Sequence, residues 1–137
     1  MRVEIVSPEG QMYSGEATML MIKGSDGELG IAPGHLQLLT RVVPGAVRIL
    51  QADGEEEVLY ISGGILEVQP HQVSILADSA ERPQDVNQAA ALEAKREAER
   101  MLASKPATLD RQKLQQELAE AMAKLRVVEL MRLKKKR

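Results

Sequence analysis

The chain changes character once, at the stretch "ERPQD" from Glu81 to Asp85. All ten glycines and four of the six prolines lie before Pro83, together with short β-branched runs such as "VEIV", "VRIL", "VLYI" and "VSIL". Such runs, separated by turn residues, are typical of β-strands. After Pro83 the apolar residues recur at intervals of three and four, which indicates helices. We therefore expect a β part over residues 1–82 and a helical part over residues 83–137.

The β part has room for about eight to ten short strands. In "AVRILQADGEEEVLYIS", Asp53 and Gly54 favour a tight two-residue turn between two strands. A second antiparallel pair is expected over residues 65–68 and 73–76, joined through Pro70 and His71. The segments "VEIVSPEG", "ATMLMIKG" and "ELGI" add further strands. Short strands with regular turn signals and no intervening helix predict a β-sandwich or a flattened barrel.

One turn carries a histidine, in the stretch "GELGIAPGHLQLLT". Pro33 and Gly34 are the turn-forming residues, and we expect Ile31 and Leu36 on either side to point into the core. From this pattern alone, His35 is most simply a polar turn residue.

Two helices are expected in the second part. The spacing of Asp85 and Gln88 is that of a capping box at the start of a first helix. The proline in "SKPAT" should end that helix, and Thr108 can cap the second. The apolar stripes are Ala90, Ala94, Ala98 and Met101 in the first helix, and Leu114, Leu118, Ala121, Leu125 and Val128 in the second. The small residues imply that the two helices pack closely as an antiparallel hairpin. Because its apolar stripes are narrow, we expect the hairpin to gain stability by docking on another surface and to be able to move.

The composition excludes several classes of site. The chain has no cysteine, two histidines and two aromatic residues, Tyr13 and Tyr60, so thiol chemistry, Cys-based zinc sites and base-stacking platforms are not expected. His35 and His71 have no second ligand nearby in sequence, so no metal site is expected. The glycines of "GSDGELG" lead into a strand instead of a helix, which argues against a phosphate loop. We expect neither catalytic machinery nor a membrane span. We expect the protein to be cytoplasmic.

Net charge divides the chain at the same place as the change in residue types. Residues 1–82 carry five basic and twelve acidic side chains, a net charge of −7, whereas residues 83–137 carry thirteen basic and eight acidic, a net charge of +5. Basic residues gather late in the second helix, at Lys124, Arg126, Arg132 and the "KKKR" tail. Taken alone, they could be a solvated helix end or could attract nucleic acid or anionic lipid. No nucleic-acid fold signature or interleaved aromatic residue supports the latter.

Four blocks, in order along the chain, resemble the epsilon subunit of bacterial F-type ATP synthase. They are "GELGIAPGHLQLLT", "YISGGILEVQPHQVSILADSAER", "ALEAKREAER" and "LAEAMAKLRVVEL". The resemblance implies a ten-stranded β-sandwich followed by a two-helix hairpin. It also implies a non-catalytic rotor subunit without a cofactor, which couples proton-driven rotation to ATP synthesis and lies at the cytoplasmic face of the inner membrane only through its complex.

The same resemblance implies partners and contact residues. The sandwich would pack on the gamma subunit and on the ring of c subunits, with Glu28 and His35 on the c-ring surface. The hairpin would fold against the sandwich or extend along gamma toward the alpha and beta subunits, where it inhibits ATP hydrolysis. In the extended state Lys124, Arg126 and Arg132 would meet an acidic segment of the beta subunit. With opposite net charges on its two parts, the chain could also favour the folded form.

A nucleotide motif of the family is degraded here. Many bacterial members carry Ile/Leu-Asp-x-x-Arg-Ala at the start of the first helix, and some bind ATP there. Aligned through "ALEAKREAER", the motif falls on residues 86–91, where Asn87 replaces the aspartate and Ala90 replaces the arginine. Asn87 could still hydrogen-bond an adenine edge, but the side chain that could meet a phosphate is absent, so ATP is not an expected ligand.

Two other functions remain open on the residues alone. A stand-alone ligand-binding sandwich or small enzyme would need a concave polar pocket. A nucleic-acid binder using the basic hairpin would need a strongly salt-dependent affinity.

Overall fold

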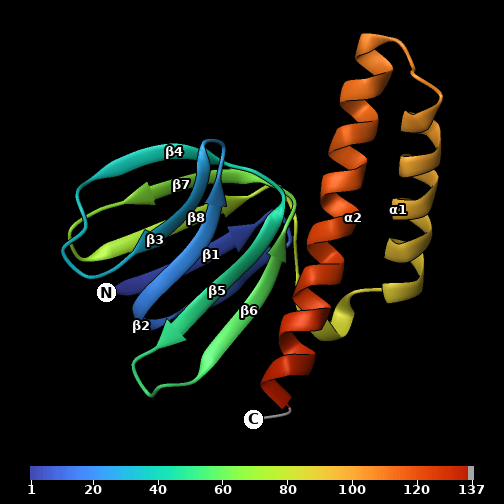
Figure 1. Ribbon diagram of the computed structural model, residues 1–137. Coiled ribbons are helices and arrows are strands. Elements are labelled where there is room, and N and C mark those ends of the chain that lie inside the picture. The colour runs from blue at the N-terminus through green and yellow to red at the C-terminus, as the bar shows by residue number, and fades with distance from the viewer. Residues whose placement is uncertain (136–137) are drawn as a thin grey trace.

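The computed structural model describes residues 1–135. Within this range nine strands precede a short 3-10 helix and two long α-helices, which stand beside the strands as an antiparallel pair (Figure 1). The elements are β1 (Arg2–Ser7), β2 (Gly10–Gly24), β3 (Gly27–Ile31), β4 (Leu38–Val42), β5 (Gly45–Gln51), β6 (Glu56–Ile61), β7 (Gly64–Val68), β8 (Gln72–Ala77), β9 (Ala80–Glu81), η1 (Pro83–Asp85), α1 (Gln88–Ala103) and α2 (Thr108–Lys135).

The strands curl into a closed, flattened sandwich. β1 pairs in parallel with β8 and antiparallel with β2, and β8, β7, β4 and β2 follow one another, so the hydrogen-bonded ring closes. β5, β6 and β9 extend from β2. Alternate side chains point inward and fill the interior. The interior residues that are at most 1% exposed are Val3, Ile5, Leu20, Ile22, Ile31, Val47, Ile49, Ile61, Leu66, Val68, Val73 and Ile75. The expected fold class, a β-sandwich followed by a helical hairpin, is confirmed.

The described range contains nine strands, which agrees with the eight to ten expected from the residues and is one fewer than the resemblance implies. β2 is the longest strand of the nine, with 15 residues. Its first half pairs with β1, and its second half pairs with β3 and β5 on opposite sides, at Leu20 for example.

The histidine turn has the expected form. The His35 backbone N–H donates to the Ala32 carbonyl at 3.0 Å, and Gly34 has a φ of +85°. A Pro-Gly pair with positive φ at the glycine is a type II turn. Ile31 is fully buried as expected, but the expectation for Leu36 is wrong, since its side chain is 83% exposed. Leu36 lies in the irregular segment before β4, where no strand alternation directs it inward.

The β5–β6 hairpin exists, but its loop is longer than the expected two residues. The Gln51 N–H donates to the Glu55 carbonyl at 2.8 Å, which leaves Ala52, Asp53 and Gly54 in the loop. Gly54 has a φ of +89°. A three-residue loop with glycine in the left-handed region is the next most common hairpin connection.

Both helix starts differ from the expected caps. Asn87 caps α1, because its side-chain oxygen accepts a hydrogen bond from the Ala90 N–H at 2.9 Å. Asp85 instead ends the turn η1, so the expected capping box with Gln88 is absent. Thr108 is the first residue of α2, and the Arg111 N–H donates to the Ala107 carbonyl just before it. The expected cap at Thr108 is therefore wrong by one position.

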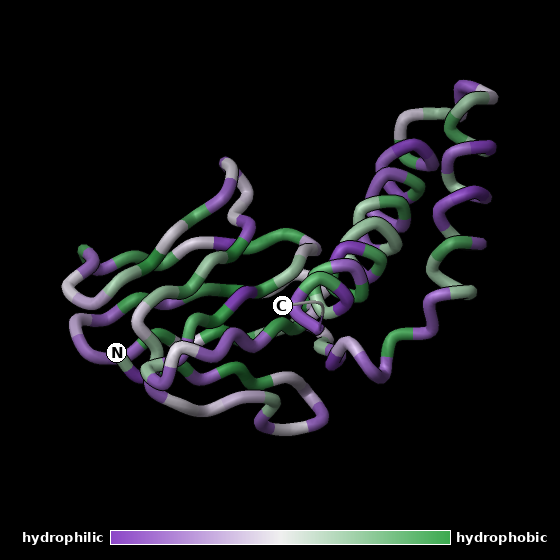
Figure 2. Tube along the Cα trace, turned by 60° about the horizontal axis from the view of Figure 1, so that its bottom comes forward, coloured by the Kyte–Doolittle hydropathy of each residue, from purple (hydrophilic) through white to green (hydrophobic). Residues whose placement is uncertain are grey.

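The helix faces were partly predicted. In α2, Leu114 and Ala121 are buried and the rest of the expected stripe is half-buried. In α1, Ala90 and Ala94 are exposed, and the buried alanines are Ala91 and Ala98. Because six of the sixteen residues of α1 are alanine, its composition did not distinguish between faces one residue apart. Hydrophobic and hydrophilic stretches alternate along both helices (Figure 2).

Candidate functional site

The hairpin rests on the sandwich through β6, a strand that is buried on both faces. Leu59 and Ile61 point into the sandwich core, whereas Val58 and Tyr60 point outward and are nevertheless only 1% and 2% exposed. The side chains of α2 that cover them are Ala123, Val127 and Leu130. The sequence signal was the unbroken run "VLYI", since a strand with one wet face alternates apolar and polar residues. We refer to Val58, Tyr60, Ala123, Val127 and Leu130 as the docking cluster.

α2 therefore has a second apolar stripe, which the sequence analysis missed. Ala123, Val127 and Leu130 recur at intervals of four and three, as the first stripe does. Leu125 and Val128 of the first stripe share a groove with Gln88 and Lys95 of α1. One side of α2 thus serves the hairpin and another serves the sandwich.

Two lysines flank the docking cluster with ion pairs. Lys124 Nζ lies 3.7 Å from Glu81 Oε2 and 5.3 Å from the centroid of the Tyr60 ring. Lys134 Nζ lies 3.9 Å from Glu55 Oε2 and donates to the Glu56 carbonyl. The basic hairpin thus meets acidic side chains of β9 and of the β5–β6 region, in the direction expected from the two net charges.

Tyr60 is electrostatically unusual. Burial raises the pKa of its phenol well above the ordinary value, and the carboxylates of Glu120 and Glu81 raise it further. A phenolate is poorly tolerated in a dry, negatively charged position. Tyr60 therefore stays neutral, and its ring face is available to the Lys124 ammonium.

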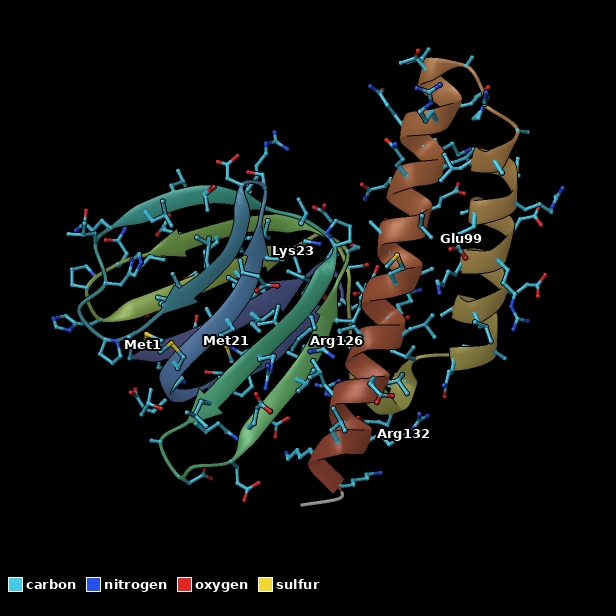
Figure 3. The ribbon with its side chains drawn as sticks, in the orientation of Figure 1. Met1, Met21, Lys23, Glu99, Arg126 and Arg132 are labelled. Carbon is cyan, nitrogen blue, oxygen red and sulfur yellow. The ribbon has the colours of Figure 1, made fainter. Side chains whose placement is uncertain are left out.

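A groove of about 810 Å³ lies between α2 and the outer face of β2, β3 and β5. Its apolar lining includes Met21 and Met122. Lys23 and Arg126 contribute positive charge, from β2 and α2 respectively (Figure 3). Arg48 also lines the groove, but its guanidinium pairs with Glu56 at 2.8 Å.

The structure separates the two residues expected at the c-ring surface. Glu28 is exposed near the start of β3, opposite Lys23 in the β2–β3 register, and lines the groove just described. His35 follows the far end of β3 and is half-buried. Its Nδ1 lies 2.8 Å from the Leu36 carbonyl. A carbonyl can only accept, so Nδ1 carries the proton and Nε2 is left to meet other groups.

The three basic residues expected to meet a partner lie on different sides of α2. Lys124 is engaged with Glu81, and its side chain is 34% exposed. Arg126 is exposed at the groove. Arg132 pairs with Glu129 on its own helix at 3.2 Å (Figure 3). Of the "KKKR" tail, the first two residues belong to α2 and the last two lie outside the described residues.

The nucleotide motif positions have local structural roles. Asn87 uses its side-chain oxygen as the cap of α1. Ala90 is exposed on the first turn. Within residues 1–135 the acidic and histidine side chains form no group of three that could hold a metal ion. None of the helices described is both long enough and apolar enough to span a bilayer.

A second surface lies on the outside of β1, β8, β7 and β4. Ile65 and Leu76 are direct cross-strand partners and are 43% and 57% exposed, and Val6 continues the row beside Leu76. Leu39, 69% exposed, lies opposite Glu67 in the neighbouring row. We call Val6, Leu39, Ile65 and Leu76 the outer apolar row. This row was not predicted from the sequence, although "GILEV" and "VSILA" carry apolar residues at successive positions.

Comparison with known families agrees with this two-part architecture. The model of the ATP synthase delta/epsilon chain β-sandwich domain matches residues 1–83, and the model of the long α-helix domain of the same chains matches residues 84–129. The chain belongs to the ATP synthase delta/epsilon chain family.

Curated relatives narrow this to the epsilon branch. The ATP synthase epsilon chain of Alkalilimnicola ehrlichii is 50% identical over 137 residues, which cover 100% of this chain and 98% of the relative. The epsilon chain of Halorhodospira halophila is 51% identical over 138 residues, with the same coverage of 100% and 98%. The resemblance to the epsilon subunit of bacterial F-type ATP synthase is confirmed.

Solved structures share the fold at low identity. A chain of the Euglena gracilis mitochondrial ATP synthase, in an assembly of OSCP, F1 and the c-ring, superposes with a TM-score of 0.76 at 19% identity, covering 88% of this chain and 76% of that one. A chain from the central stalk and c-ring of the Tetrahymena thermophila mitochondrial ATP synthase gives a TM-score of 0.53 at 17% identity, covering 64% and 69%.

Proposed function

We propose that this chain is a non-catalytic central-stalk subunit, in which residues 1–82 take part in the rotor and residues 83–137 regulate it. The sandwich would transmit proton-driven rotation of the c ring through gamma to ATP synthesis. The hairpin would inhibit ATP hydrolysis when it leaves the sandwich and reaches the alpha and beta subunits. The complex would hold the chain at the cytoplasmic face of the inner membrane as a peripheral component.

The observation that carries the regulatory part is the separation of the two apolar clusters. Among residues 1–135, the sandwich core contains no side chain of the hairpin. The docking cluster is small, and its ion pairs involve side chains that are partly exposed. Undocking therefore leaves the sandwich core intact, while the rehydrated lysines and carboxylates recover part of the lost energy. A contact of this kind can open at a modest cost.

The surfaces of the sandwich suit the proposed partners. The outer apolar row is left uncovered by the hairpin, and exposed apolar residues grouped on one sheet face are typical of a protein interface. We assign this face to gamma. Glu28 and the turn carrying His35 remain our assignment for the c ring, and the exposed Leu36 directly follows His35. Lys124, Arg126 and Arg132 remain our assignment for the beta subunit.

Removal of residues 83–137 from the assembled complex tests the regulatory part. We expect the shortened chain to copurify with gamma and the ATP hydrolysis rate of the complex to rise. An unchanged rate in a fully assembled complex would refute inhibition by the hairpin. Loss of copurification would refute the assignment of the rotor contacts to the sandwich.

A further inference from the structure

We propose that Glu81, Lys124 and Tyr60 form a latch that holds the hairpin on the sandwich and withholds Lys124 from an acidic partner. The partner in question is a protein segment carrying carboxylates. The effect on partner binding in the complex rests on the proposed function. The effect on how often the hairpin opens is a property of this chain alone.

Tyr60 and Glu81 are held together by the sheet before the helix arrives. They are cross-strand partners in the short β6–β9 pairing, which joins only two residue pairs. β9 ends at Glu81, and the connection to the hairpin begins two residues later with η1. The acceptor of the latch therefore lies directly before the segment that joins the sandwich to the hairpin.

Lys124 completes the latch from α2. Its ammonium lies 3.7 Å from Glu81 Oε2 and over the Tyr60 ring at 5.3 Å from the centroid. Oε2 is buried and has no hydrogen-bond partner within the described residues, so the ammonium is the charge that compensates it there. A buried carboxylate oxygen without compensation is costly, so the docked hairpin needs Lys124 in place.

The same pair releases easily once the hairpin moves. Both side chains are about one-third exposed, at 34% and 36%, so water reaches them as soon as the contact opens. The cost of breaking the pair is then largely offset by hydration. The latch thus biases an equilibrium and does not fix the hairpin permanently.

Engagement of Lys124 has a consequence for partner binding. Arg126 is already exposed and Arg132 is half-exposed in the docked state, whereas Lys124 is occupied by Glu81. A carboxylate of the partner must therefore compete with Glu81 for this one ammonium. By linkage, a stronger latch lowers the affinity of the chain for that partner. Binding of the partner in turn shifts the hairpin toward the open state.

The test measures the open fraction by spin-label distances in the full-length chain. The chain contains no cysteine, so Ala52→Cys in the exposed β5–β6 loop and Gln112→Cys on the exposed side of α2 give two unique labelling sites. Glu81→Gln keeps the shape of the side chain and removes its charge. We expect the ratio of long to short distances to rise roughly two- to fivefold, the range of a partly exposed ion pair. Lys124→Met should have a similar effect from the other side of the latch.

Glu97→Gln is the matched control, because Glu97 is exposed on α1 and pairs with Arg100 of the same helix. If Glu81→Gln and Lys124→Met leave the ratio at the value of the Glu97→Gln control, the latch is wrong. The double exchange Glu81→Lys with Lys124→Glu should restore the original ratio. If each single substitution raises the ratio and the double exchange does not lower it again, the latch is also contradicted.

Hydrolysis by the assembled complex separates the latch from the proposed function. If Glu81→Gln opens the hairpin and lowers hydrolysis, both stand. If it opens the hairpin and hydrolysis is unchanged, the latch stands and inhibition by the hairpin fails. If the open fraction is unchanged while deletion of residues 83–137 raises hydrolysis, the latch fails and the proposed function stands.

Discussion

Val127 of α2 packs with Tyr60 of β6 in a cluster separate from the sandwich core, and the two side chains are 0% and 2% exposed. Because the two parts have separate cores, this buried contact contributes mainly to the free energy of docking. It contributes less to the folding stability of either part. Mutations here should therefore change how the hairpin sits and leave the sandwich folded.

Val127→Ala should weaken docking by roughly 1–2 kcal/mol, because it removes two buried methyl groups and leaves a small cavity. Hydrogen exchange of the α2 amides should accelerate, while exchange in the sandwich core stays slow. Val128→Ala is the matched control, since Val128 is half-buried in the groove on the α1 side. Equal acceleration in both variants would contradict the assignment of Val127 to the docking contact.

The fold could be predicted from the sequence because its signals are local. The turn at Pro33 and Gly34, the glycine of the β5–β6 loop and the change of period at Pro83 each follow from backbone preferences of single residues. Helix faces were less certain where many residues are alanine, as Ala90 and Ala91 show. A hydrophobic pattern of low contrast does not determine a face.

The candidate site was only partly accessible from the sequence. Lys124 was singled out, but its partner Glu81 lies 43 positions away, and Tyr60 a further 21 before that. Nothing in the spacing pairs them, because contacts between strand and helix depend on how the parts dock. The second stripe of α2 was hidden for the same reason, since two stripes on one helix blur each other's periodicity. The outer apolar row depends on strand register, which the sequence alone leaves undetermined.

The stability of the docked chain should fall with rising pH above about 10, the ordinary pKa of tyrosine. The folded chain holds the phenol proton of Tyr60 more tightly than the unfolded chain does, since burial and the Glu120 and Glu81 carboxylates raise its pKa. The stabilisation is therefore complete below pH ~10 and declines above it, by up to ~1.4 kcal/mol per pH unit. Urea unfolding between pH 9 and about 11.5 measures this.

Tyr60→Phe separates this effect from others in the same range. Burial also raises the pKa of Tyr13. The contribution of Tyr13 persists in the Tyr60→Phe variant, whereas the part of the slope due to Tyr60 should disappear. Identical pH profiles for the two chains would show that Tyr60 ionises as freely in the folded chain as in the unfolded one.

Leu76→Glu should weaken the binding of gamma without unfolding the chain. Leu76 is 57% exposed beside Ile65, so a carboxylate there remains solvated in the free protein. At a protein interface the same charge would be desolvated, and we expect affinity to fall at least tenfold. Calorimetry with purified gamma measures the loss. Leu50→Glu, on the exposed side of β5, is the control, and an equal loss there would place the contact elsewhere.

Gly64→Ala should destabilise the sandwich by roughly 3 kcal/mol or more, since it combines backbone strain with a steric clash. Gly64 has a φ of +148°, and a Cβ there would overlap the Leu76 carbonyl oxygen and lie 2.9 Å from the Ala77 Cα. Both are backbone atoms of the paired strand β8, which cannot move without loss of the β7–β8 register. Gly30→Ala is the matched control, because its nearest neighbour is the flexible Met19 side chain at 3.9 Å. The free energies of unfolding of the two variants, measured with urea, should differ by at least ~2 kcal/mol. Similar midpoints would mean that the β8 backbone shifts to accommodate the Cβ despite its pairing on both sides.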